Sequence, residues 1–304
     1  MSGRMGFVGV TTASSSIMRI FPLWAEFLEL PTRQLEGHDL PLDASARDYR
    51  HLVETIRDDP DHLGALVTTH KMALFEAAHD LFDELDDFAI ACGEISSLAK
   101  RDGRLLGHAK DPLTVGLALD EFLPGDSFRS ERDAVVLGAG GAGLALTWRL
   151  AERADAPRRI VVTDTNRARL DHLAAVHEAR GTPPSLITLV DADDESARRV
   201  LAEAGDRSLI VNASGLGKDR PGSPLPDGVD FPQGATVWEF NYRGSLEFLS
   251  QARAQASARD LTVVDGWRYF IHGWTQVISE VFHIPMTPER VELLAELAEP
   301  FRSS

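Results

Sequence analysis

The sequence predicts a two-domain α/β protein with a cleft between the domains, and three observations lead to this prediction. Short apolar runs typical of strands alternate with helical patterns in both halves of the 304-residue chain. Near residue 112 a region that includes a hairpin gives way to regular strand–helix alternation. Two further helical stretches close the chain. We therefore expect one domain from residues 1–112, completed by residues 266–304, and a second domain from residues 113–265.

The N-terminal region carries strands and helices in mixed order. Residues 5–10 (MGFVGV) read as a short buried strand, and residues 14–30 show helical apolar spacing despite Pro22. Residues 44–59 form an amphipathic pattern that predicts a helix, and the strand LGALVTT follows it. The run ISSLAKRDGRLLGHA predicts a hairpin, because two alternating stretches are joined by an Asp-Gly pair, the strongest short signal for a hairpin turn.

The second region alternates strands and helices and predicts a doubly wound parallel sheet. Its strand-like runs are DAVVLG, RIVVTD, SLITLVD, SLIVNAS, TVWEFN and LTVVDG, with helical runs between most of them. The Gly- and Pro-rich loop at 214–228 is the longest irregular segment of this half, and such loops are more often functional or mobile than inert. The closing helices are expected at about 267–283 and 287–301.

A glycine fingerprint directly follows the first strand of the second region. Gly138, Gly140 and Gly143 have the spacing G-x-G-x-x-G and stand at the start of a helix. The first glycine permits a tight turn, the second lets the backbone approach a pyrophosphate, and the third lets helix pack on strand. The helix N-terminus adds free N–H groups and a positive dipole end. Together they predict a dinucleotide site.

An acidic residue at the end of the next strand indicates the type of dinucleotide. Asp164 lies 21 residues beyond Gly143, where a carboxylate accepts hydrogen bonds from the adenosine ribose and repels a 2′-phosphate. The alternative is a helix N-cap in TDTNRA, and the two roles are compatible. Arg167 and Arg169 follow closely and are able to grip a phosphate. NAD is therefore favoured over NADP.

Lys71 and Asp111 are candidates for the chemistry. Lys71 stands where a strand ends and a helical pattern begins, and Asp111 stands where the hairpin ends and the next helix begins. Oxidation of an alcohol needs a proton acceptor, and a lysine serves if burial brings its pKa down toward neutrality. Asp111 would hold the amine and the substrate hydroxyl in register. The alternative is a solvated lysine and a helix N-cap, and spacing alone leaves both open.

The chain resembles the shikimate/quinate dehydrogenases along nearly its whole length. Those enzymes carry N-V-T-x-P-H-K, G-A-V-N-T and D-G-x-L-x-G-x-N-T-D before the Rossmann glycines, and ALVTTHK, GEISS and DGRLLGHAKD stand here in the same order. Farther along, NAS, VWEFNY and DGWRYF resemble the family's N-A-T/S, V-x-D-x-x-Y and G-x-x-M-L. The resemblance implies a substrate domain beside an NAD(P)-binding Rossmann domain, a role in aromatic amino acid biosynthesis, and Lys71 and Asp111 as the catalytic pair.

The resemblance also implies the binding residues. Those expected at the substrate, with Tyr242 at the nicotinamide end, are Ser14, Ser16, Thr69, Ser96 and Tyr242. For Ser16 a helix N-cap is the alternative. The residues expected at the cofactor are Gly138, Ala139, Gly140, Gly141, Ala142, Gly143, Asp164, Thr165, Asn212, Ala213, Ser214 and Gly266.

Several positions depart from the family. Its two substrate-binding asparagines fall at Ser96 and Ala109, and its C-terminal glutamine falls near Gly273. The proline before His70 is Thr69, and the threonine before Asp111 is Lys110. Bulky aromatic residues, Trp267, Tyr269 and Trp274, stand on the helix that borders the family's pocket, although aromatic helix residues more often belong to the core. These departures concern the substrate more than the reaction.

Composition limits the partners. A net charge of −16 disfavours nucleic acid and anionic membranes, so a small-molecule substrate is expected, bound by a monomer or homodimer. Cys92 is the only cysteine, and no H-x-x-x-H or H-E-x-x-H spacing occurs, so no metal site is expected. There is neither a signal-peptide h-region nor a long apolar run, which predicts a cytoplasmic protein.

The sequence thus predicts an oxidoreductase that reversibly oxidises a secondary alcohol on a small cyclic hydroxy acid or polyol with NAD(P). Shikimate and quinate are the nearest named substrates. One alternative is a non-catalytic dinucleotide-binding regulator on the same fold, which the altered pocket favours and the retained Lys71 and Asp111 oppose. A second is a related enzyme acting on a folate or an aminated ring.

Overall fold

The computed structural model describes residues 3–128, 132–218 and 220–302, which divide into two compact units. The first unit comprises residues 1–114 and 271–304, and the second comprises residues 115–270. The boundaries therefore fall inside two helices, α5 (Asp111–Asp120) and α10 (Trp267–Phe282). Among the described residues, no helix is both long enough and apolar enough to cross a membrane.

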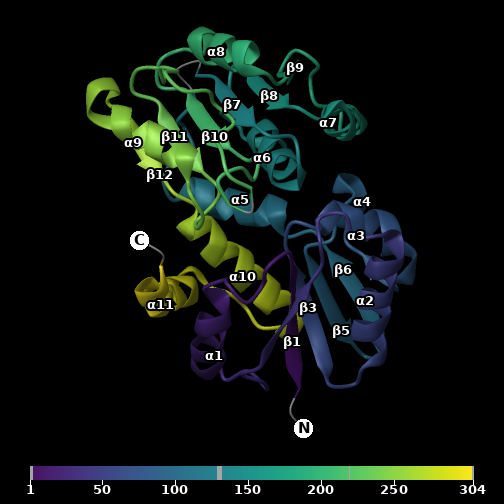
Figure 1. Ribbon diagram of the computed structural model, residues 1–304. Helices are drawn as coiled ribbons and strands as arrows, with labels where there is room; N and C mark the ends of the chain where they lie inside the picture. The colour runs from purple at the N-terminus through teal and green to yellow at the C-terminus, as the bar shows by residue number, and fades with distance from the viewer. Residues whose placement is uncertain (1–2, 129–131, 219, 303–304) are drawn as a thin grey trace. The chain divides into compact units, whose positions relative to one another are not determined.

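The first unit contains a six-stranded mixed sheet in the order β2-β1-β3-β5-β6-β4. Figure 1 labels its strands β1, β3, β5 and β6. Its strands are β1 (Arg4–Gly9), β2 (Leu35–Asp39), β3 (His62–Val67), β4 (Glu84–Leu85), β5 (Ser97–Arg101) and β6 (Arg104–His108). Its helices, besides the shared α5 and α10, are α1 (Ile17–Phe27), α2 (Ala46–Asp58), α3 (Lys71–Ala78), α4 (Asp87–Cys92) and α11 (Pro288–Ala298). Strands β1, β2 and β3 are parallel, whereas β5 runs antiparallel to β3 and β6.

Local signals account for several of these elements. Ser45 and Asp48 form a capping box at the start of α2, and Thr287 caps α11 with a proline at its first turn. The hairpin β5–β6 turns through Asp102 and Gly103, both with positive φ, as a two-residue hairpin turn matched to strand twist requires. Strand β2 was not predicted, because this short edge strand reads LEGHD and lacks an apolar face.

The second unit is a parallel doubly wound sheet in the order β12-β11-β10-β7-β8-β9, the Rossmann topology. Its strands are β7 (Ala134–Leu137), β8 (Ile160–Asp164), β9 (Ile187–Asp191), β10 (Leu209–Asn212), β11 (Thr236–Glu239) and β12 (Thr262–Val264). Its remaining helices are α6 (Gly141–Glu152), α7 (Arg167–Ala179), α8 (Asp194–Glu203) and α9 (Glu247–Arg259). The predicted fold class is confirmed.

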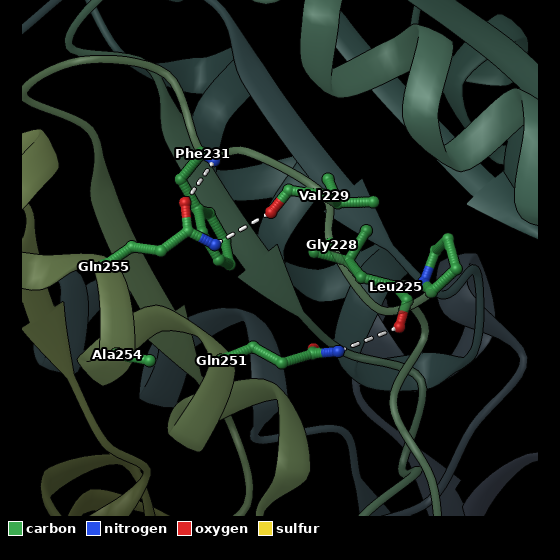
Figure 2. A pocket seen from close by; sticks show the side chains of 8 residues that line it. Leu225, Gly228, Val229, Phe231, Gln251, Ala254 and Gln255 are labelled. Carbon is green, nitrogen blue, oxygen red and sulfur yellow. Dashed lines mark hydrogen bonds between the residues drawn. The ribbon is translucent and has the colours of Figure 1, made fainter.

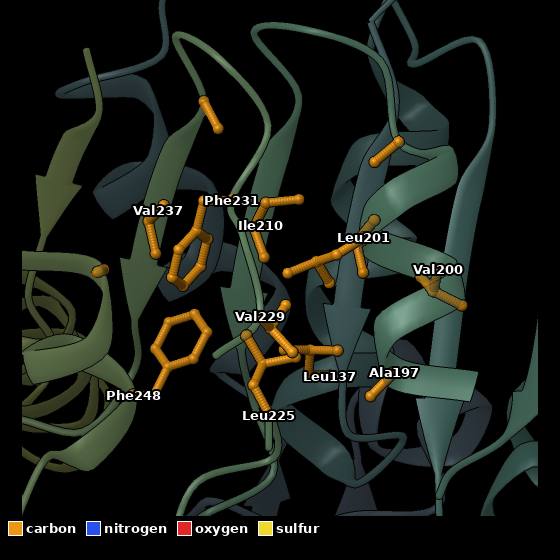
Figure 3. Packing of buried hydrophobic residues seen from close by; sticks show 14 of the residues in the cluster. Leu137, Ala197, Val200, Leu201, Ile210, Leu225, Val229, Phe231, Val237 and Phe248 are labelled. Atoms are coloured by element: carbon orange, nitrogen blue, oxygen red, sulfur yellow. The ribbon is translucent and has the colours of Figure 1, made fainter. Parts of the chain in front are cut away.

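One face of this sheet packs against helices α8 and α9 and the loop before β11 (Figure 3). Leu225, Val229 and Phe231 of that loop are buried with strand residues such as Ile210 and Val237. The end of the Gly- and Pro-rich segment is therefore part of the core.

Two glutamines of α9 fasten the same loop (Figure 2). The Gln255 amide accepts from Phe231 N and donates to Val229 O, and the Gln251 amide donates to Leu225 O at 3.2 Å. The small pocket lined by these residues has its polar side chains bonded to the loop backbone, so its role is structural.

Candidate active site and dinucleotide site

The first unit brings Lys71 and Asp111 together. Lys71 is the first residue of α3, just beyond the carboxyl end of β3, and Asp111 is the first residue of α5, just beyond β6. The Lys71 ammonium donates a hydrogen bond to Asp111 Oδ2. The two side chains are only 19% and 7% exposed, so the pair is largely shielded from water. Lys71 is thus no solvated lysine, and Asp111 begins α5 rather than preceding it as a cap.

The expected lowering of the Lys71 pKa is wrong for this geometry. Burial lowers the pKa of Lys71, but the charges of Asp111 and Glu94 and the hydrogen bond to Asp111 raise it more, so the net shift is upward. An ammonium beside a shielded carboxylate is the stable form of this pair. Lys71 is therefore an ammonium at neutral pH.

Glu94 is a functional candidate that the sequence analysis missed. Its side chain is buried, and neither carboxyl oxygen has a hydrogen-bond partner among the described residues. Burial raises the pKa of Glu94 to about 8, with the charge of Asp111 adding to the shift and Lys71 opposing it. Glu94 is therefore mainly protonated at neutral pH, next to the Lys71–Asp111 pair. The signal was present in GEISS, where the family pattern G-A-V-N-T has an alanine.

The turn before Lys71 is held by His70. Its ring Nε2 lies 3.0 Å from Leu40 O and its Nδ1 lies 2.8 Å from the Tyr49 hydroxyl, which assigns the N–H to Nε2. Thr69 has φ 45°, a left-handed conformation that is rare for a β-branched residue. A proline, with φ fixed near −65°, could not adopt it. The backbone before the lysine therefore excludes the family's proline and holds threonine in a conformation that is unusual for that residue.

The predicted serines occupy different environments. Ser14 is exposed and donates to Thr11 O at 3.1 Å. Ser16 occupies the N-cap position of α1 but makes no side-chain cap, because its hydroxyl donates to Phe301 O at 3.0 Å. Ser96 is buried, where its hydroxyl accepts from Lys110 N at 2.7 Å and donates to His108 O at 3.3 Å. Ser96 thus fastens the backbone just before Asp111.

The other altered positions do not restore the missing amides. The Lys110 ammonium pairs with Glu280 Oε2 at 2.6 Å, and His108 and Arg101 contact the same carboxylate. Ala109 is buried, and at Gly273 an added Cβ would meet only Thr114, at 3.8 Å. Lys110 is therefore already engaged.

Helix α10 has two buried tryptophans, and its Phe270 contacts a tyrosine of the second unit. Trp274 is buried and meets Phe7 edge-on at 4.9 Å, and Trp267 is buried against Phe270. Tyr242, in the loop after β11, lies 4.2 Å from the Phe270 ring, centroid to centroid. Trp267 and Trp274 are core residues, as the alternative held.

In the second unit, the three glycines of the fingerprint differ in what surrounds them. A Cβ on Gly138, which has φ 118°, would lie 2.6 Å from Ser214 Cα, and one on Gly143 would lie 2.0 Å from Gly138 O. A Cβ on Gly140 would meet nothing within 4 Å. Gly138 and Gly143 thus serve close packing between β7, β10 and α6, while Gly140 leaves open space at the helix start. Because the first N–H groups of α6 have no acceptor within the helix, this cradle suits a phosphate.

Asp164 ends β8 beside this loop. Its Oδ2 accepts from Ala139 N at 2.8 Å and its Oδ1 accepts from Asn166 N at 2.8 Å. The N-cap of α7 is Asn166, so Asp164 does not cap that helix. Arg169 approaches Asp164 to 3.8 Å, whereas Arg167 pairs with Asp171 and Asp191. Thr165 is exposed beside them.

A buried polar network lies at the carboxyl ends of β10 and β11. Asn212 donates to Glu239 at 2.7 Å and accepts from Ser214 N and Oγ, and Asn241 donates to Glu239 and to Leu216 O. Burial raises the pKa of Glu239 to about 7, although the hydrogen bonds it accepts lower it in part. The network fixes the loop that contains Ala213 and Ser214, next to Gly138. Glu239 and Asn241 were not predicted as site residues.

Gly266 completes the predicted set at the start of α10. An added Cβ there would lie 2.2 Å from Phe240 O, so only glycine permits this approach to the loop after β11.

Comparison with known proteins identifies the family. No family model matches the chain. A shikimate dehydrogenase (NADP(+)) from Symbiobacterium thermophilum is 34% identical over 214 residues, which cover 69% of this chain and 67% of that protein. One from Xanthomonas euvesicatoria pv. vesicatoria is 32% identical over 216 residues, 70% of each chain. This chain belongs to the shikimate/quinate dehydrogenase family.

Solved structures of quinate and shikimate dehydrogenases align with this chain over nearly its full length. A quinate dehydrogenase from Corynebacterium glutamicum in complex with NAD aligns with a TM-score of 0.76 at 22% identity, covering 98% of this chain and 99% of the other. A shikimate 5-dehydrogenase from Thermus thermophilus in complex with shikimate aligns with a TM-score of 0.68 at 25% identity, covering 97% and 98%. Family membership makes the chain an NAD(P)-dependent oxidoreductase that acts on a CH–OH group.

Proposed function

We propose that the chain reversibly oxidises a secondary alcohol on a small cyclic hydroxy acid or polyol, with Lys71 as general acid/base and Asp111 as its partner. The observation that carries the proposal is the shielded Lys71–Asp111 pair at the ends of β3 and β6. A structural role alone gives little reason to bury such a pair, because desolvation of two charges offsets most of their attraction.

Lys71 would move the proton. In the reducing direction its ammonium donates to the carbonyl oxygen, and in the oxidising direction the neutral amine accepts the hydroxyl proton. Because the pKa of Lys71 is raised in this geometry, oxidation needs a prior proton loss whereas reduction does not. Asp111 would orient the ammonium toward the substrate oxygen, since its Oδ2 already accepts from Nζ.

The dinucleotide, when bound, supplies the hydride acceptor or donor. Gly138 to Gly143 would hold its pyrophosphate at the start of α6, where Gly140 leaves the space open. Asp164 would accept from the ribose hydroxyls, which favours NAD over NADP. Arg167 is already paired with two carboxylates, which reduces its availability for a 2′-phosphate.

The first unit would bind the substrate. Ser14, Ser16, Thr69 and Ser96 would contact its polar groups, and Tyr242 of the second unit would line the nicotinamide end. Ser16 and Ser96 already donate their hydroxyl protons to backbone carbonyls, so they would serve the substrate as acceptors.

A substrate panel tests the proposal. Cyclic hydroxy acids and polyols, shikimate and quinate included, are assayed for NADH and NADPH formation at saturating cofactor. We expect turnover of at least one ring alcohol and a higher kcat/KM with NAD. Binding of dinucleotide without turnover of any ring alcohol would contradict the proposal and support a regulator instead.

A further inference from the structure

Two histidines and a glutamate from strands β2 and β3 meet on the sheet of the first unit. His62 is the first residue of β3, and Glu36 and His38 are on the edge strand β2, with β1 between the two strands. One ligand atom from each of the three lies within 4.8 Å of the other two. Through their pairing with Gly6 and Val8 of β1, Glu36 and His38 are in register with Ala65 and Val67 of β3, so the His62 side chain reaches them along the strand as well as across it.

Gly6 of β1 makes this meeting possible. A Cβ at Gly6 would come 2.7 Å from His62 Cε1 and 2.9 Å from His62 Nε2, so the imidazole lies over a position that has no side chain. The His62 ring thereby reaches across β1 to β2. Gly6 pairs with Glu36 in the sheet and His38 is two residues farther along β2, so both β2 side chains emerge on one face.

The two imidazoles point nitrogen to nitrogen. His38 Nε2 and His62 Nε2 are 3.2 Å apart. If both bind one zinc ion at the usual Zn–N distance of about 2.0–2.1 Å, this separation corresponds to an N–Zn–N angle of about 100°, close to tetrahedral. We propose that Glu36, His38 and His62 form a binding site for a divalent transition-metal ion of the zinc class, with a fourth position open to water.

The charges around the cluster are compatible with a cation. Glu36 Oε2 accepts from Arg4 Nε, and a carboxylate has a second oxygen to offer. Arg4 also pairs with Asp59, so two carboxylates contact its positive charge. The ionised groups that face the two imidazoles are the cations Arg4 and Lys100 and the carboxylates Glu36, Asp39 and Asp59. Three carboxylates thus stand against two cations.

The Arg4 hydrogen bond to Glu36 would orient the ligating carboxylate in the way outer-shell partners do. Such an ion would join the edge strand β2 to β3 and stabilise the sheet.

Zinc titration of the full chain tests the site. Chain stripped with chelator is titrated with Zn²⁺ in a buffer that does not bind metals, and with Co²⁺ while the visible spectrum is recorded. We expect one tight equivalent, a tetrahedral Co²⁺ spectrum, a higher melting temperature with Zn²⁺ and unchanged turnover. The variants are His38→Gln and Glu36→Gln, and the matched control is His51→Gln, an exposed histidine of α2 in the same unit.

We expect His38→Gln to weaken zinc binding on the order of 100-fold or more, since even outer-shell changes cost about 10–100-fold. Glu36→Gln should weaken it about tenfold or more on the same basis, and His51→Gln should leave it unchanged. Because the Glu36 side chain is 43% exposed, that variant remains informative if His38→Gln fails to fold. Absence of a one-equivalent phase, equal binding by Glu36→Gln, or X-ray absorption showing fewer than two imidazoles on zinc would each overturn the proposal.

Discussion

Lys71 gains its chemical character from one residue that lies 40 positions away in the chain. Asp111 accepts the hydrogen bond from Nζ and keeps the ammonium charged inside a shielded site, against the effect of burial. The protonated Glu94 stands next to this pair as a third titratable group. Glu94 differs from Asp111 in its contacts, because Asp111 accepts a hydrogen bond from Lys71 whereas the Glu94 carboxyl has no hydrogen-bond partner among the described residues.

Replacing Lys71 should stop the chemistry and spare the cofactor site. Lys71→Met is expected to lower kcat by about 10²–10⁴, the usual contribution of a positioned general acid/base. Dinucleotide affinity should stay within a few-fold, since the glycine loop is in the other unit. Steady-state kinetics and fluorescence titration with the dinucleotide measure both. The control is Lys100→Met, whose ammonium binds Ile56 O and Asp59 O. Near-normal turnover by Lys71→Met would disprove the proton-transfer role.

Glu94 should make the protein less stable as pH rises. Its folded pKa of about 8 exceeds the ordinary 4.5, so the folded state binds more protons than the unfolded state between these values. The free energy of unfolding therefore falls with rising pH across that window, by at most about 1.4 kcal/mol per pH unit from this one group. Glu94→Gln should flatten the dependence.

Urea unfolding at pH 5.5 to 8 measures this effect. The matched control is Glu76→Gln, an exposed glutamate of α3 that should retain the wild-type slope. Identical slopes for wild type and Glu94→Gln would mean that Glu94 has a normal pKa and a partner such as water.

At the scale of elements, the turn from β7 into α6 separates packing from binding within one motif. A Cβ at position 143 would clash with the backbone carbonyl of Gly138, and a Cβ at position 138 would clash with the backbone at Ser214. Both positions therefore require glycine. Gly140 faces neither, and its φ of −72° suits any residue. Contact with a bound ligand is therefore the only evident reason for a glycine at position 140.

Gly140→Ala should therefore fold normally and bind dinucleotide poorly. The added methyl group meets no protein atom within 4 Å but occupies the space proposed for the pyrophosphate. We expect a melting temperature near that of wild type and NAD(H) affinity reduced at least tenfold, by a clash worth about 1.4 kcal/mol or more. Gly143→Ala is the contrasting variant, expected to lose stability as well. Unchanged NAD(H) affinity in Gly140→Ala would place the pyrophosphate elsewhere.

Asp164 should decide between the two cofactors. Asp164→Ser removes a carboxylate from beside Arg169 and is expected to raise NADP use relative to NAD, because the 2′-phosphate is no longer repelled. The ratio of kcat/KM values for the two cofactors measures the change. A wild-type enzyme that already prefers NADP would refute the ribose assignment, whatever the variant did.

At the scale of the whole molecule, we expect three positions from separate parts of the chain to govern the choice of substrate. Ser96 precedes β5, Ala109 follows β6 and Gly273 lies in α10, and each replaces an amide side chain of the family pattern. Lys110 does not compensate in this geometry, because Glu280 holds its ammonium. We therefore expect the reaction to be better retained than the family's ring specificity.

Shikimate should be a poor substrate. Each matched hydrogen bond contributes about 0.5–1.5 kcal/mol, so weakening up to three of them lowers kcat/KM on the order of 10- to 10³-fold. A ring with fewer or differently placed hydroxyls is expected to be preferred. Steady-state kinetics decide the matter, and a kcat/KM for shikimate near about 10⁶ M⁻¹s⁻¹, well inside the usual range for efficient enzymes, would exclude the hypothesis.

The sequence by itself determined the Rossmann sheet, most of the other elements and the two motifs that contain Lys71 and the fingerprint glycines, but it did not predict β4 or α4. These features depend on local patterns: apolar periodicity, an Asp-Gly turn, and glycines at fixed spacing. Strand β2 escaped prediction, because the edge of a sheet tolerates polar residues that leave no period to read.

The tertiary structure alone decided the charge on Lys71, the burial of Glu94 and the meeting of His38 with His62. Each depends on which side chains from distant segments share a low-dielectric space, and a pKa or a ligand set follows from those distances. The spacings H-x-x-x-H and H-E-x-x-H describe two histidines on one helix, so they cannot reveal a pair that belongs to two strands. Gly6, which is an ordinary strand glycine in the sequence, is the residue that lets that pair meet.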